Sequence, residues 1–259
     1  MNRRCLVSVL WLGLSVAPGC DAVAGDDYQG EVLATIRGLV VEDGDGPPRA
    51  IPPLDVALVW GVWEGDAPAQ ARVLAQKVPI KGSFPADFEL GVRQPPPAGA
   101  GVRRGDVTAS FAFIAAIAHD SWQPGTPIRA GQTVEAYGHA AEAVLHLDKD
   151  LTDEAWSTLL GGVRTAGFHL VEMIDPSQMS AMEKQMRIDA CRKLVAPSEL
   201  AMCDGVLEPG AYHPRLAAGD LQHRIHMEVS WEPTILGGGG SGPEPEPDPG
   251  AGGLVPGRH

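Results

Sequence analysis

Three sets of side chains have types and spacings that suit chemistry, and the first is an acid–base pair. His119 and Asp120 follow an apolar stretch directly. Imidazole and carboxylate groups are the common proton carriers of general acid–base catalysis. Neighbouring side chains on a strand point to opposite faces, so a dyad requires the chain to turn here, as Pro124 and Gly125 allow. The alternative is an ordinary turn at the end of a strand.

The other two sets contain metal-ligand types. His223 and His226 would share a ligand sphere on a helix, but this segment alternates like a strand, where residues three apart face opposite ways. We therefore expect a half-buried His223 and an exposed His226. Asp43 and Asp45 offer carboxylate oxygens for Ca²⁺ but lack the third acidic position and the distant Glu of an EF-hand loop, so a hairpin turn is favoured. The sequence predicts no metal site and no cofactor.

The common catalytic motifs are missing from the sequence. It contains no Gly-x-Ser-x-Gly, no His-Glu-x-x-His, no Walker loop and no Cys-x-x-Cys. No catalytic residue is assigned on this basis. The 20 Lys and Arg residues stand against 33 Asp and Glu residues, for a net charge of −13. A chain without a basic surplus cannot neutralise phosphates, so we expect no nucleic-acid partner.

The N-terminus has the layout of a bacterial secretory signal peptide. Arg3 and Arg4 precede an apolar run at residues 6–16, which ends in Ala-Pro-Gly-Cys at residues 17–20. Small residues before a cysteine resemble a lipobox, although the alanine and the proline depart from its usual pattern. We predict that residues 1–19 are removed and that Cys20 is lipidated at the head of a short lead, residues 20–29. Ordinary signal-peptidase cleavage is the alternative.

Cysteine usage agrees with an exported chain. Of the four cysteines, Cys5 would leave with the signal peptide, and Cys191 and Cys203 lie close enough in sequence to form a disulfide in an oxidising compartment. Lipidation then accounts for the remaining Cys20. The acidic chain is not attracted to an anionic membrane, so the lipid would supply the anchoring to a bacterial membrane, on its periplasmic or surface face.

The elements that must position these residues are mostly strands. Short β-rich segments separated by Gly and Pro turns predict a mainly β fold, an antiparallel β-sandwich. The expected strands are 31–41, 54–63, 71–80, 83–92, 107–118, 133–137, 142–147, 167–174 and 221–231. A short helix at 150–160 and a long helix at 175–194, capped by Asp175, are expected before the last strand. The domain spans residues 30–236, and the Gly, Pro and acidic tail at 237–259 is predicted to be disordered.

The large apolar residues are mostly assigned to the core. Trp60 and Trp231 lie on strands that pack two sheets together, whereas Trp122 lies in a polar turn. An exposed aromatic residue in a loop is a common recognition anchor, so Trp122 is the candidate binding residue. Its alternative role is to fold back over the edge of the sandwich. Met179, Met182 and Met186 fall on one face of the long helix and are expected to fill the core.

Several segments together resemble lipoproteins of myxobacterial type. They are the lipobox-like start, residues 30–38, 56–60, 84–88 and 95–97, and Gly-Phe-His-Leu at 167–170. The resemblance implies an envelope location and a β-rich fold, with no activity to carry over. Members of this kind often have an Asp, Asn and Gly-rich loop after the strand that corresponds to 107–118. Here His119 to Gly125 stand in that place without the acidic residues, so no ion site is carried over.

Two classes of function follow from the sequence. The first is an envelope-anchored lipoprotein that acts as a noncatalytic binding or scaffolding module, with the membrane and an envelope protein as its partners. The alternative is an envelope hydrolase or metal-dependent enzyme with an unfamiliar site around His119 and Asp120.

Overall fold

The computed structural model describes residues 30–43, 52–62, 71–81, 83–125, 127–128, 133–201, 203, 207, 212–230 and 232–237. Their secondary-structure elements all belong to one compact unit that starts at Glu31. The predicted signal peptide, the Cys20 lipidation site and the tail beyond residue 237 lie outside the described residues, as do Asp45 and Trp231. Within the described residues, no helix combines the length and the apolar character needed to cross a membrane.

The fold is mainly β, as predicted. The strands are β1 (Ala34–Glu42), β2 (Leu54–Val62), β3 (Ala71–Pro79), β4 (Ala86–Val92), β5 (Gly101–Arg104), β6 (Val107–Ala118), β7 (Pro127–Ile128), β8 (Thr133–Leu147), β9 (Gly167–Ile174), β10 (His213–Leu216), β11 (Arg224–Val229) and β12 (Thr234–Gly237). The helices are α1 (Glu154–Leu159) and α2 (Ala181–Leu194), with 3-10 turns η1 (Pro176–Gln178), η2 (Pro197–Glu199) and η3 (Asp220–Gln222).

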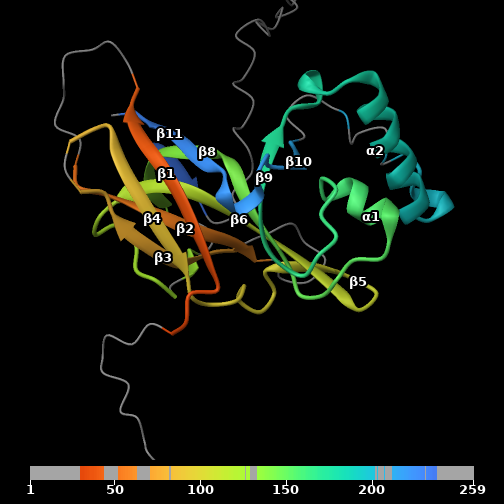
Figure 1. Ribbon diagram of the computed structural model, residues 1–259, viewed down its shortest axis with the longest axis horizontal. Coiled ribbons are helices and arrows are strands. Elements are labelled where there is room, and N and C mark those ends of the chain that lie inside the picture. The colour runs from red at the N-terminus through yellow and green to blue at the C-terminus, as the bar shows by residue number, and fades with distance from the viewer. Residues whose placement is uncertain are drawn as a thin grey trace, which may run out of the picture. The chain divides into compact units, whose positions relative to one another are not determined.

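The strands form two sheets (Figure 1). The small sheet has the order β11-β1-β4, and the large sheet has the order β10-β9-β8-β6-β2-β3-β7, with β12 paired to β8 and β5 paired to β6. All pairs are antiparallel among the described strands except β1 with β11, which is parallel. The expected antiparallel sandwich is therefore confirmed with one parallel pair.

The main core lies between the two sheets. Ile36 and Leu90 of the small sheet and Leu58 and Trp60 of the large sheet are fully buried in it. Each such side chain contributes about 2 kcal/mol by leaving water. Alternation along β2 explains why this strand serves two cores, because Leu58 and Trp60 point to the small sheet while Val59 points to the opposite face.

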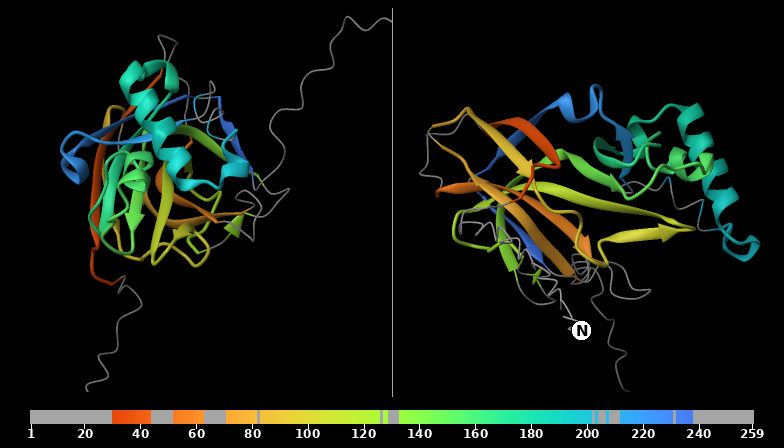
Figure 2. Two further views of the ribbon diagram at one scale, coloured as in Figure 1. Left: turned by 90° about the vertical axis from the view of Figure 1, so that its right-hand side faces the viewer. Right: turned by 60° about the horizontal axis from the view of Figure 1, so that its bottom comes forward.

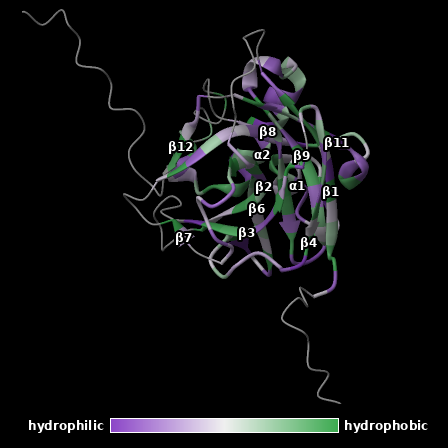
Figure 3. Ribbon diagram, turned by 90° about the vertical axis from the view of Figure 1, so that its left-hand side faces the viewer, coloured by the Kyte–Doolittle hydropathy of each residue, from purple (hydrophilic) through white to green (hydrophobic). Residues whose placement is uncertain are grey.

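The second face of the large sheet is covered in two places. Trp122, β7 and β12 cover Val59 and its neighbours at one end, whereas α1 covers β8 and β9 at the other. In Figure 3, apolar segments follow the strands, and β2 and β6 lie between the small sheet and the side that carries β7 and β12. Strand β2 is thus central, as its two apolar faces predict.

Gly138 allows the two sheets to approach each other where β8 passes β11. A Cβ atom at this position would lie 2.2 Å from the carbonyl oxygen of Glu228. The Ser230 N–H donates to the Tyr137 carbonyl at 2.7 Å beside it. The two strands predicted at 133–137 and 142–147 are one strand, β8. Because Gly138 has no side chain, β8 stays extended where it passes the backbone of Glu228.

The helices lie together at one end of the unit, beside β9 and β10 (Figures 1 and 2). Asp175 caps as predicted, but it starts η1, because Met179 then has extended backbone and the helix breaks. Ser180 starts α2 and forms a second capping box with Glu183. The predicted helix over 175–194 is therefore two elements.

Candidate functional site

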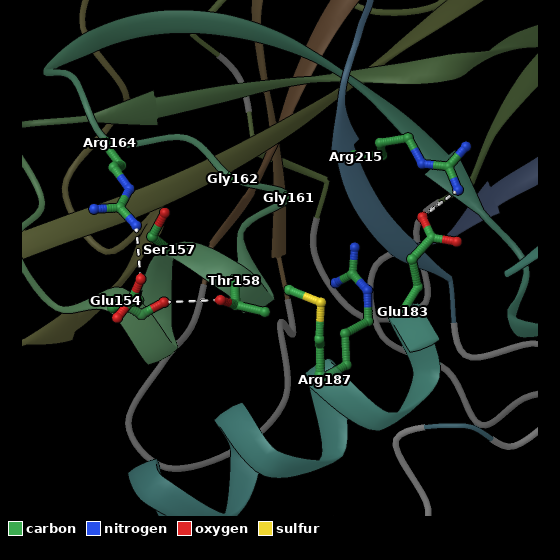
Figure 4. A pocket seen from close by; sticks show the side chains of 10 residues that line it. Glu154, Ser157, Thr158, Gly161, Gly162, Arg164, Glu183, Arg187 and Arg215 are labelled. Atoms are coloured by element: carbon green, nitrogen blue, oxygen red, sulfur yellow. Dashed lines mark hydrogen bonds and ion pairs between the residues drawn. The ribbon is translucent and has the colours of Figure 1, made fainter. Parts of the chain in front are cut away.

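A cavity of about 440 Å³ opens between α1, α2 and β10 (Figure 4). Its lining residues are Glu154, Ser157, Thr158, Gly161, Gly162, Arg164, Glu183, Met186, Arg187 and Arg215. Three arginines from three different parts of the chain thus line one space in a chain whose net charge is −13. Such a local concentration of guanidinium groups is suited to carboxylate or phosphate ligands.

Local structure holds the cavity wall in place. Asp153 accepts the Trp156 N–H at 3.0 Å and caps α1. Gly161 then ends the helix with a φ of +78°, a left-handed conformation that side chains rarely adopt. A Cβ atom at Gly161 would also lie 2.7 Å from the Pro214 carbonyl oxygen, so glycine lets the turn approach β10 closely.

Arg187 is the central cation of the cavity. Its side chain rises from α2 and donates to the carbonyl oxygens of Leu159 at 3.2 Å and Pro214 at 2.6 Å. The residue is only 6% exposed, and within the described residues no carboxylate hydrogen-bonds to it. Burial lowers the pKa of Arg187, Glu183 opposes that shift and Arg215 adds to it. A guanidinium carries five N–H donors, so several stay available for a ligand.

The other two arginines are already paired with carboxylates. Arg215 contacts Glu183 at 2.8 Å, and Arg164 contacts Glu154 at 3.3 Å. Figure 4 shows these two pairs on opposite sides of Arg187. Hydrogen bonds from the backbone and the hydroxyl of Ser180, and then Arg215, lower the pKa of Glu183 to about 2. Glu183 is therefore a carboxylate at neutral pH, and it both caps α2 and holds Arg215.

A second polar cluster is centred on Asp55 at the start of β2. One oxygen of its carboxylate, which is 1% exposed, lies 2.6 Å from His119 Nδ1, and the other lies 2.8 Å from Lys77 Nζ. Lys77 also donates to the carbonyl oxygen of His119. The imidazole is half exposed, and its Nε2 lies 4.0 Å from a carboxylate oxygen of the exposed Asp120. The orienting carboxylate of His119 is thus Asp55, which the sequence did not indicate.

Trp122 does not have the surface position that its predicted binding role requires. It is 4% exposed and packs with Ala57, Val59 and Leu236 on the second face of the large sheet. The turn folds back over the sheet, which is the alternative stated from the sequence. The expectation of an exposed anchor was wrong. The second face of the large sheet is apolar, and the side chains of Trp122 and of β12 cover it.

The methionine expectation holds for one residue and fails for two. Met179 is buried, but Met182 is 72% exposed and Met186 is 52% exposed. The face of α2 that packs inward contains Arg187, Ala190 and Cys191 instead. Met186 therefore lies at the cavity rather than in the core.

The predicted disulfide is confirmed. Cys191, on α2, is bonded to Cys203, and their Cα atoms are 5.7 Å apart. The bond fixes the chain after α2 to the helix that carries Arg187.

The histidines of the last predicted strand are separated by the fold. His223 lies 3.2 Å from a carboxylate oxygen of the buried Glu142, whereas His226 is exposed on β11. Throughout the described residues, no three His, Cys, Asp or Glu side chains gather in a way that could hold a metal ion.

Comparison with known proteins gives no relative. No protein-family model matches the chain, and no curated protein or solved structure matches it.

Proposed function

We propose that this protein is an envelope-anchored lipoprotein whose β-sandwich carries a noncatalytic binding site for an anion between α1, α2 and β10. The signal-peptide layout and Cys20 support the anchor. The observation that supports the binding site is Arg187, a cation that is 94% buried and faces a cavity without a carboxylate partner in the described residues.

The physical argument concerns the cost of burying a guanidinium to which no carboxylate of the described residues is hydrogen-bonded. Removing a guanidinium from water is costly unless an opposite charge or hydrogen bonds compensate for it. Two carbonyl oxygens compensate Arg187 in part. A bound carboxylate or phosphate would supply an anion in direct contact with the guanidinium, through short, charge-assisted hydrogen bonds. Arg164 and Arg215 at the two sides of the cavity would add further donors.

The proposal is tested by titrating the purified full chain with inorganic phosphate and with acetate at constant ionic strength, using calorimetry. Cys20→Ser prevents the predicted lipidation. We expect binding by this parent chain, with an affinity lowered at least about fivefold in Arg187→Gln and in Arg164→Gln, since each variant removes about 1 kcal/mol or more of charge-assisted bonding.

Arg37→Gln is the matched control, because Arg37 is also an exposed arginine paired with a glutamate, Glu89, at 2.9 Å. It lies on β1, which belongs to the small sheet. Arg164→Gln keeps the test valid if Arg187→Gln fails to fold. Arg164 is exposed and contacts Glu154 at the surface, so its replacement should not affect folding. Equal weakening by Arg37→Gln, or no binding of either anion by the parent chain, would contradict the proposal.

The second candidate function is acid–base chemistry at His119, now with Asp55 as the orienting carboxylate. A buried carboxylate on Nδ1 fixes the orientation of the ring and leaves Nε2 toward solvent, as in catalytic dyads. Hydrolysis of p-nitrophenyl acetate by the full chain tests it. We expect a rate that falls in His119→Gln and in Asp55→Asn but not in His226→Gln, and equal rates in all four proteins would exclude this candidate.

A further inference from the structure

A second cavity of about 220 Å³, between α1 and α2, adjoins the arginine-lined cavity. The two cavities share Glu154, Thr158 and Met186. The second one is also lined by Ala155, Asp189, Ala190 and Lys193. We call the two cavities together the helix groove. It is defined by all residues that line either cavity. Its size lies within the range of small-molecule sites.

The two parts of the helix groove differ in chemistry. The first part contains the three arginines, with Arg187 at its centre. The second part is lined by the small, buried side chains of Ala155 and Ala190 and by Met186, with the charged Asp189 and Lys193 beside them. Met186 lines both parts while 52% of its surface is open to solvent. Unbranched methionine adapts readily to an apolar ligand.

We infer that the ligand of the helix groove is an anion that carries an alkyl chain. The head, a carboxylate or a phosphate, would lie against Arg187, and the chain would run between the helices along Met186 and Ala190. This inference rests on the proposed anion site and adds the ligand class. The charged head provides what Arg187 lacks, and the chain covers the apolar side of Met186, so one molecule satisfies both observations.

The test is a chain-length series of alkyl carboxylates, from acetate to octanoate, titrated into the full chain with Cys20→Ser below the micelle concentration. Burial of a methylene contributes about 0.8 kcal/mol, so we expect the affinity to rise about fourfold for each methylene that enters the groove. Octanol has the same chain without the charge and should bind at least about tenfold more weakly than octanoate, since a charge-assisted hydrogen bond is lost.

Met186→Gln should flatten the dependence of the affinity on chain length, because the apolar side chain that the alkyl chain would contact is lost. Met182→Gln is the matched control, because Met182 lies one turn away on α2, is more exposed and lines neither cavity. Octyl phosphate, titrated in parallel, distinguishes the two sources of an anionic head. Tighter binding of octyl phosphate supports a phospholipid-derived ligand, and tighter binding of octanoate supports a free fatty acid.

The failures of the two proposals are distinguishable. If phosphate and acetate bind but octanoate binds no more tightly than acetate, the alkyl-chain inference is overturned and the anion site stands. If octanol binds as tightly as octanoate, the charged head is not recognised and the inference is also overturned. If neither short nor long anions bind, both proposals fall.

Discussion

Asp55 and His119, which are 64 residues apart in the chain, share a hydrogen bond of 2.6 Å at the shared end of β2 and β6. The antiparallel register brings them together, because Leu54 is opposite Ala118. Lys77, from the neighbouring strand β3, provides the balancing positive charge. Three adjacent strands are thus joined at one end by a buried carboxylate.

Asp55→Asn should lower the free energy of unfolding by about 3 kcal/mol. Removing one member of a buried ion pair leaves the partner charge uncompensated, here that of the mostly buried Lys77. Chemical denaturation of the variant measures the loss. Asp120→Asn is the control, because the Asp120 side chain is 92% exposed, and it should change stability by less than about 0.5 kcal/mol. Similar losses in the two variants would contradict a structural role for the buried carboxylate.

Trp122→Ala should destabilise the protein by about 4 kcal/mol, the usual cost of removing a large aromatic side chain from a core. Trp122 covers Val59 and Leu236 on the second face of the large sheet. Thermal unfolding would show a large fall in the midpoint. An unchanged midpoint would mean that the side chain is not packed as described.

Glu183 should titrate well below an ordinary glutamate. Its pKa is about 2 in the folded protein against 4.5 for the free group, so the folded state binds a proton less readily than the unfolded one. The stabilisation is therefore fully present above pH 4.5 and is lost as the pH falls toward 2. Carbon NMR of the carboxyl group should give the low midpoint.

The contribution of Glu183 to acid stability can be separated with variants. In Glu183→Gln, this part of the pH dependence should be missing, while Glu199→Gln, in the 3-10 turn after α2, should retain it. A Glu183 midpoint near 4.5 would show that Ser180 and Arg215 do not hold the carboxylate.

His146 should stay neutral at a pH where an ordinary histidine is half protonated. Burial lowers its pKa, and Asp148 only partly opposes that effect. The unfolded state then binds the proton more readily, so stability should fall as the pH drops below 6.5, the ordinary value. His146→Gln should remove this loss in denaturation experiments at pH 7 and pH 5. His226→Gln, at an exposed histidine, should not remove this loss. The same response in both variants would refute the lowered pKa of His146 as the cause of the pH dependence.

The disulfide should contribute about 3 kcal/mol to stability, because Cys191 and Cys203 are separated by 12 residues and the bond restricts the unfolded chain. Cys191→Ser with Cys203→Ser, compared with the parent chain by urea denaturation without reductant, gives the difference. Equal free energies of unfolding in the two proteins would show that the disulfide does not stabilise the folded state by restricting the unfolded chain.

The central strands could be predicted from the sequence because their patterns are local. Strand β2 is apolar on both faces and is central, and β11 alternates and buries Ile225 and Met227. Strands β5, β7, β10 and β12 were missed, since two to four residues are too short to show a period. The long helix was predicted across Met179, where the structure has a break.

The candidate site could not be predicted because its residues meet only in the folded chain. Arg187 and Arg215 come from α2 and from a strand that the sequence did not reveal. Helical spacing placed Met186 in the core, but spacing does not tell which side of a helix has a partner. The sequence singled out His119 but not its partner Asp55, which stands in an otherwise apolar stretch, where a buried carboxylate is itself the signal.

The parallel pairing of β1 with β11 has a consequence for the order in which the protein acquires its structure. Arg37 lies opposite Arg224, so one edge of β1 finds its partner only when nearly the whole domain is available for folding. Until then, β1 can pair on its other side alone, with β4. Such long-range pairing slows folding, because the intervening chain must be closed into a loop first. The first strand of the described domain is therefore completed by one of its last two strands, and a chain that ends before residue 224 leaves this edge of β1 unpaired.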